Sequence, residues 1–154
     1  MAIDLYDSNG TLSTFNVTVN NRNQSLVLEN VTSAPSAVVM DGTASILMTI
    51  DHAKTEAELM AQAKYATKFL HVYSAVNNLK EDASFAILQD EMLAYPHYSI
   101  RAKAIKEMDV TKVGASDILI KLATNDEHSK VRAAALNALV NVEGTDLNLL
   151  VSKI

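Results

Sequence analysis

The chain has 154 residues, of which 49% are hydrophobic and 20% are charged, with a formal net charge of -5. This composition is too apolar for intrinsic disorder. The mild negative charge argues against nucleic acid as a partner, because a phosphate backbone requires a basic surface. No apolar run approaches the roughly 18 residues of a membrane span, and no targeting segment is recognisable. The absence of cysteine excludes disulfides and thiolate ligands but leaves the cellular compartment open.

The first fifty residues contain short segments in which apolar and polar residues alternate, which is the period of a half-buried strand. Asn9 and Gly10 indicate a hairpin turn between two such segments, because both residues accept a positive φ at little cost. Further turn residues separate three more candidate strands. We therefore expect an antiparallel β-sandwich-like module in residues 1–52, with strands near residues 3–5, 15–19, 25–29, 37–40 and 44–50.

Five short strands need an opposing layer to bury their apolar face, and the other apolar residues of the chain follow a helical pattern. We expect the strand module to pack on these helices. Strands from an upstream part of a longer parent protein are a second possible cover, and without them one strand edge would be exposed. Self-association through that edge is therefore expected.

From Thr55 onward the hydrophobic period changes to that of an α-helix. Thr55 and Glu58 match a capping box, which marks the start of a helix. Leu59, Ala63 and Ala66 would then share one apolar face. Proline and glycine residues separate the helices that follow. These are predicted over residues 69–79, 83–93, 98–108, 116–123, 129–140 and 146–154.

An internal similarity indicates how the helices are organised. Residues 97–105 align with residues 128–136 at an offset of 31, and the same offset superposes Ile87-Leu88 on Ile118-Leu119. The repeating unit therefore spans two helices, and a weaker copy occurs at Ala75-Val76. A two-helix unit of this length is typical of HEAT-like repeats. We expect residues 53–154 to form a HEAT-like α-helical superhelix, which makes the fold class α+β.

We expect no complete catalytic, cofactor or metal site within this chain. The four histidines, at positions 52, 71, 97 and 128, lack the spacing of a helical zinc site. No nucleophile elbow, phosphate-binding glycine loop or dinucleotide fingerprint occurs. His97 and His128 are equivalent in the repeat, so both are expected near helix N-caps. The acidic pairs Asp90-Glu91 and Asp126-Glu127 lie near predicted helix ends, where solvation and the helix dipole account for them.

Arg101 and Arg132 recur at the same position of the repeat. Each is expected to cap a neighbouring helix or to form an inter-repeat salt bridge. Contact with a ligand is the alternative interpretation of this pair.

The order of the segments resembles the C-terminal, non-catalytic portion of zinc aminopeptidases related to aminopeptidase N. The likeness covers nearly the whole chain. It rests on Leu5-Tyr6-Asp7 with Gly10, the Val19-Asn20 turn with Gln24, Pro35 with Val38 and Asp41-Gly42, and Ala63-Lys64-Tyr65-Ala66. In that family a small β-sandwich lies between the catalytic domain and a superhelical array of HEAT-like helices. The family's zinc ligands, general base and substrate-amine motif have no counterpart here, and His71-Val72-Tyr73 replaces the Asp-Arg-Leu often found at the first repeat.

The resemblance implies a structural segment of an enzyme that removes N-terminal residues from peptides with a zinc-bound water. Zinc would belong to the parent enzyme and not to this chain. The implied partner is the catalytic domain of the parent polypeptide. Peptide substrates are an indirect partner, because this segment would form part of the wall of the peptide chamber. A stand-alone HEAT-like scaffold that binds a partner protein is the main alternative. A carbohydrate-binding sandwich is disfavoured, because the strand module has one aromatic beyond Tyr6, namely Phe15.

Overall fold

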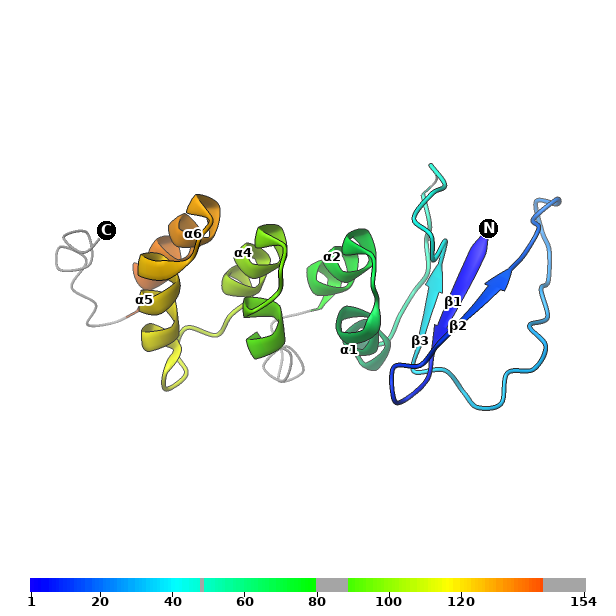
Figure 1. The fold of residues 1–154 in the computed structure, drawn as a ribbon, viewed down its shortest axis with the longest axis horizontal. Coiled ribbons are helices and arrows are strands. Elements are labelled where there is room, and N and C mark those ends of the chain that lie inside the picture. Colours follow the sequence, from blue (N-terminus) through cyan, green and yellow to red (C-terminus); the bar gives the residue numbers. More distant parts are fainter. Residues whose placement is uncertain (48, 80–88, 143–154) are drawn as a thin grey trace. The chain divides into compact units, whose positions relative to one another are not determined.

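The computed structural model describes residues 1–47, 49–79 and 89–142 and shows a mixed α+β fold (Figure 1). The chain divides into two compact units, Met1–Leu79 and Lys80–Ile154. The first unit contains a three-stranded antiparallel sheet and two helices, and the described part of the second unit is helical. The predicted boundary after residue 52 lies between the sheet, which ends at Met40, and the first helix, which begins at Glu56, whereas the compact unit continues through the first two helices.

The sheet of the first unit consists of β1 (Ala2–Tyr6), β2 (Leu12–Asn16) and β3 (Ala37–Met40), in the order β2-β1-β3. β1 is the central strand and all five of its residues are buried. β2 is an edge strand, and four of its five residues are exposed. Both neighbours of β1 pair with it in antiparallel register.

The turn between β1 and β2 confirms the hairpin that the sequence predicts. Gly10 has a φ of +82°, and a Cβ added there would lie 2.4 Å from the ring of Tyr65. Only glycine satisfies both constraints without strain. The carboxylate of Asp7 accepts backbone N–H bonds from Asn9 and Thr11, each at 2.8 Å, which closes the turn.

The expectation of five strands is wrong for two of them, and the strand expected at 15–19 lies instead at Leu12–Asn16. Residues 25–29 and the described residues of 44–50 form no ladder, so the sheet has three strands. Local side chains bind the neighbouring backbone instead, which competes with strand pairing. Gln24 accepts a bond from the N–H of Asn20 at 3.0 Å and donates to the carbonyl of Thr18 at 2.9 Å. Asp41 accepts a bond from the N–H of Ile46 at 2.8 Å.

Two helices, α1 (Glu56–Tyr65) and α2 (Phe69–Asn78), pack against each other, and α1 also packs against β1 and β3. The capping box at Thr55 is confirmed: its hydroxyl accepts the N–H of Glu58, and the Glu58 carboxylate accepts the N–H of Thr55. The predicted apolar face of α1 is buried. The helical layer expected to support the strands is therefore present within the first unit.

The second unit contains a helical turn at residues 89–93, followed by α4 (Tyr98–Lys106), α5 (Ala115–Asn125) and α6 (Ser129–Leu139). α6 packs against both α4 and α5. The fully buried side chains come from all three helices and are small or aliphatic: Ile100, Ala104, Leu119, Ala123, Val131, Ala135 and Leu139. These helices match the sequence prediction to within a few residues. The predicted helix at 146–154, and residues 83–88 of the one at 83–93, lie outside the described residues.

Candidate functional site

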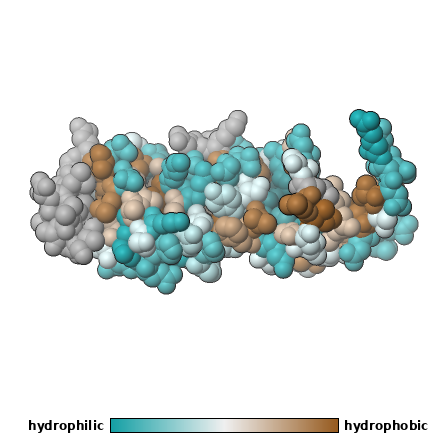
Figure 2. Space-filling view, turned by 90° about the horizontal axis from the view of Figure 1, so that it is seen from above, coloured by the Kyte–Doolittle hydropathy of each residue, from teal (hydrophilic) through white to brown (hydrophobic). Residues whose placement is uncertain are grey.

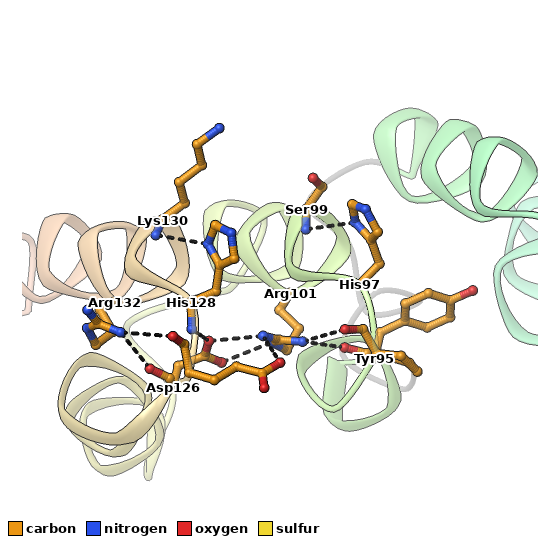
Figure 3. A network of polar contacts seen from close by, with 10 residues as sticks. Tyr95, His97, Ser99, Arg101, Asp126, His128, Lys130 and Arg132 are labelled. Carbon is orange, nitrogen blue, oxygen red and sulfur yellow. Dashed lines mark hydrogen bonds and ion pairs between the residues drawn. The ribbon is translucent and has the colours of Figure 1, made fainter.

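The repeat recurs in the way that α4 and α6 begin. His97 and His128 are the N-cap residues, and the Nδ1 atom of each ring accepts a backbone N–H bond of 3.2 Å, from Ser99 and Lys130 respectively (Figure 3). Histidine can accept at Nδ1 only when that nitrogen carries no proton. Both rings therefore satisfy one of the helix N–H groups that lack a partner in the first turn. This confirms the N-cap position predicted for both histidines.

Arg101 lies on α4 and is 6% exposed. Its Nε donates to Oδ2 of Asp126 at 2.9 Å, and its Nη2 donates to Oδ1 of the same carboxylate at 3.0 Å and to Glu127 at 3.2 Å. Its Nη1 donates to the backbone carbonyls of Tyr95 and Pro96, at 2.9 and 2.8 Å. A guanidinium has five N–H groups, so these five bonds use all of them. Arg101 thus joins the end of the turn before α4 to the loop between α5 and α6 (Figure 3).

Arg132 occupies the equivalent place on α6 and repeats part of this arrangement. Its Nη1 donates to the carbonyls of Asp126 and Glu127, at 2.9 and 3.2 Å. These two residues follow Tyr95 and Pro96 by the same offset of 31 that separates the arginines. Among the described residues, no acceptor is bonded to Nε or Nη2 of Arg132. Arg101 is therefore a complete inter-helix clamp, and Arg132 carries the half of that clamp that binds its own preceding turn.

The surroundings of Arg101 and Asp126 favour the charged form of both side chains. Burial alone would raise the pKa of Asp126, but the bonds from Arg101 and from the His128 N–H, the latter at 2.9 Å, outweigh it and lower the pKa. The hydrogen bond to Asp126 raises the pKa of Arg101. Both groups are therefore charged at neutral pH, and their bidentate pairing is the stronger kind of ion pair. With every donor of Arg101 engaged, the geometry favours the structural interpretation over ligand binding.

Aromatic rings connect the same two helix starts. Tyr98 stacks on His128 with ring centroids 3.7 Å apart and planes 3° from parallel. The ring of His97 also stacks on Tyr98 in this ring column, with centroids 4.8 Å apart. The ammonium group of Lys130 is 5.5 Å from the Tyr98 ring, within the range of a cation–π contact. The N-caps, the clamp and this column together fix the register of α4 against α6.

A polar cleft in the first unit brings together residues that the sequence patterns do not associate. It has a volume of about 480 Å³ and lies beside β3, α1 and α2. Lys54 donates from Nζ to the carbonyl of Val38 and to the side chain of Gln62, and burial lowers the pKa of this lysine. Gln62 in turn donates to the carbonyl of His71 at 2.8 Å, and the His71 ring contacts the carbonyl of Asp41 at 3.0 Å. These bonds hold the sheet, α1 and α2 together.

Sequence reasoning missed both Lys54 and Gln62. The signal for Gln62 is its place on the apolar face of α1, where it is only 4% exposed. A buried amide requires hydrogen-bond partners, and Lys54 and His71 supply them. No comparable pattern identifies Lys54, because the bend that carries it to β3 is a tertiary feature. With its bonds made to protein groups, we read the cleft as a structural junction.

The first unit also presents apolar side chains to solvent. Val27 is 86% exposed, Leu47 is 106% exposed and Val19 is 54% exposed. A neighbouring groove of about 640 Å³ is lined largely by apolar residues, including Val17, Leu26, Met40, Ile46 and Ile50. Hydrophobic surface lies over the strand-bearing unit in Figure 2. Exposed apolar surface gathered in one place is typical of an interaction site.

The structure gives two further findings on the described residues. No helix in the described ranges has the length and hydropathy to cross a membrane, and these ranges hold no cluster of three or more His, Cys, Asp or Glu side chains arranged to bind a metal. Comparisons with protein-family models, with curated proteins and with solved structures gave no match to this chain.

Proposed function

We propose that this chain is a non-catalytic structural segment of a zinc metallo-aminopeptidase, which braces the catalytic domain and helps to enclose the peptide chamber. In this proposal the first unit provides part of a β-sandwich-like module. The helical pairs provide HEAT-like repeats. The parent enzyme holds the zinc, and this chain contributes packing surface and shape.

The observation that carries the proposal is the exposed apolar surface of the first unit. Side chains such as Val27, Leu47 and Val19 gain stabilisation only when they are removed from water. The three-stranded sheet also has fewer strands than the sequence pattern offers. A neighbouring domain that covers this surface would supply the missing layer, which is the role that the resemblance assigns to the catalytic domain.

The arginines support the repeat part of the proposal. Arg101 on α4 pairs with the carboxylate of Asp126, in the loop that precedes α6. Arg132 holds its own preceding turn in the same way, and among the described residues no acceptor is bonded to its Nε or Nη2. An acidic residue of a further helical pair would complete this second clamp. Arrays of stacked pairs are stabilised by such nearest-neighbour contacts.

The experiment uses the full-length reading frame that contains this chain. Val19→Asp and Ile46→Asp place charges on the exposed apolar surface of the first unit, and Val113→Asp is the control on an exposed apolar side chain of the second unit. The first two variants should split thermal unfolding of the parent enzyme into two transitions and increase proteolysis between its domains. The control should do neither. Equal behaviour of all three variants contradicts the proposal, as does turnover of peptides by the isolated chain with added zinc.

A stand-alone HEAT-like scaffold that binds a partner protein is the alternative function. It is favoured by the matched N-caps and arginine contacts of α4 and α6, which stabilise paired helices with no need of an enzyme. The genomic context separates the two proposals. An upstream coding region with a zinc-binding helix in the same reading frame supports the peptidase segment, and a reading frame without one supports the scaffold.

A further inference from the structure

The free edge of β2 presents an ordered set of backbone groups. In the β1–β2 ladder, the Val17 N–H bonds the Met1 carbonyl at 2.8 Å and the Asp7 N–H bonds the Thr11 carbonyl at 3.1 Å. Hydrogen-bonded pairs alternate along an antiparallel ladder. With Ile3 opposite Phe15, the alternation directs the backbone groups of Ser13 and Phe15 toward β1. The N–H and C=O groups of Leu12, Thr14 and Asn16 therefore point away from the sheet.

These outward groups have no bonded partner among the described residues. β2 lies at the end of the strand order β2-β1-β3, and four of its five residues are exposed. Two groups on each of three residues make six backbone donors and acceptors on this edge. An edge of this kind is a template for another strand.

The edge also lacks the features by which proteins prevent such pairing. Residues 8–21 contain no charged side chain and no proline. Inward-pointing charges, edge lysines and edge prolines are the usual protection. The side chains of β2 are Leu, Ser, Thr, Phe and Asn, so two copies of the strand would not repel each other.

We propose that β2 pairs antiparallel with β2 of a second copy of this chain, joining two three-stranded sheets into one sheet of six strands. The outward backbone groups of Leu12, Thr14 and Asn16 are arranged symmetrically about Thr14. When Thr14 faces Thr14 of the second copy, Leu12 faces Asn16 on both sides of the two-fold axis. All six outward groups of each strand are then used. The pairing is isologous, so it closes at the dimer and does not extend into a fibre.

This dimer is independent of the proposed peptidase role, since it uses the strand edge and not the exposed apolar side chains. The Thr14 side chain also leaves the edge backbone available, because its hydroxyl donates within the sheet to Asp4 at 2.7 Å.

The test is light scattering of the full chain after size exclusion, over a concentration range that spans about 10 µM to 1 mM. The unmodified chain should pass from monomer to dimer. Asn16→Pro removes an outward N–H without removing a β1–β2 bond, and it should weaken dimerisation at least tenfold. Asn16→Ala is the matched control and should dimerise as the unmodified chain does. Circular dichroism verifies that all three are folded.

A second measurement fixes the register. The chain has no cysteine, so Thr14→Cys introduces a single thiol. Hydrogen-bonded partners lie with Cα atoms about 5.5 Å apart, which is within disulfide range. Oxidation should link Thr14→Cys copies covalently and leave Val27→Cys, at a site 86% exposed, largely unlinked. A chain that stays monomeric throughout the range overturns the proposal, and so does a dimer that Asn16→Pro leaves intact or that links equally well through both cysteines.

Discussion

Replacing Arg101 with alanine should destabilise the second unit by about 3–5 kcal/mol, the usual cost of removing one partner of a buried ion pair. Both charged side chains are nearly inaccessible, at 8% for Arg101 and 6% for Asp126, so solvent screens the pair little. Glu127 is 81% exposed and adds little to the total. The variant would leave the Asp126 carboxylate without its guanidinium and would remove the donors to the carbonyls of Tyr95 and Pro96.

Urea denaturation followed by far-ultraviolet circular dichroism measures this change, and hydrogen exchange of α4 and α6 locates it in the second unit. Arg132→Ala is the matched control, because it removes only the two carbonyl bonds of Nη1. Its expected cost is about 1–2 kcal/mol. The reasoning is refuted if the two alanine variants lose equal stability, since the carboxylate pairing of Arg101 would then contribute nothing beyond the shared carbonyl contacts.

The remaining predictions concern a cap, a glycine and a carboxylate. His128→Ala should lower stability by about 1–2 kcal/mol through loss of the N-cap and the ring stack, and His128→Asn should restore the cap part, as measured by thermal unfolding. Gly42→Ala should destabilise the first unit by about 1–3 kcal/mol, because its Cβ would lie 2.2 Å from the buried Asp4 carboxylate. The lowered pKa of Asp126 stabilises the fold above its unfolded value of about 3.9. This contribution should vanish as the pH falls below about 4, and Asp126→Asn should not show that loss.

Each of these outcomes has a clear contrary result. An asparagine at position 128 that is as damaging as alanine would mean that the ring and not the cap matters. A neutral Gly42→Ala variant would show that the Asp4 carboxylate can move aside at no cost. An acid profile of Asp126→Asn that parallels the unmodified protein would assign the acid sensitivity to other carboxylates.

Local physical chemistry explains which parts of the fold could be predicted from the sequence. The capping box at Thr55, the turn at Gly10 and the N-caps at His97 and His128 depend on residues within a few positions of each other, and all are confirmed. The helices of the second unit were predictable for the same reason, since their apolar period and their Pro and Gly boundaries are local. The sequence repeat likewise singled out Arg101 and Arg132.

Tertiary structure decided the contacts that join distant segments. Residues 25–29 alternate like a strand, yet they join no ladder, and the adjacent Gln24 binds the backbone of Thr18 and Asn20 in the preceding loop. The partner of Arg101 is Asp126, 25 residues further along the chain. The offset between repeats does not show toward which neighbouring helix a guanidinium points. Lys54 reaches Val38 only after the chain has turned back onto β3. Period and spacing identify the helices, whereas the competition for hydrogen-bond partners, which decides whether an alternating segment joins a sheet, is settled only when the elements pack.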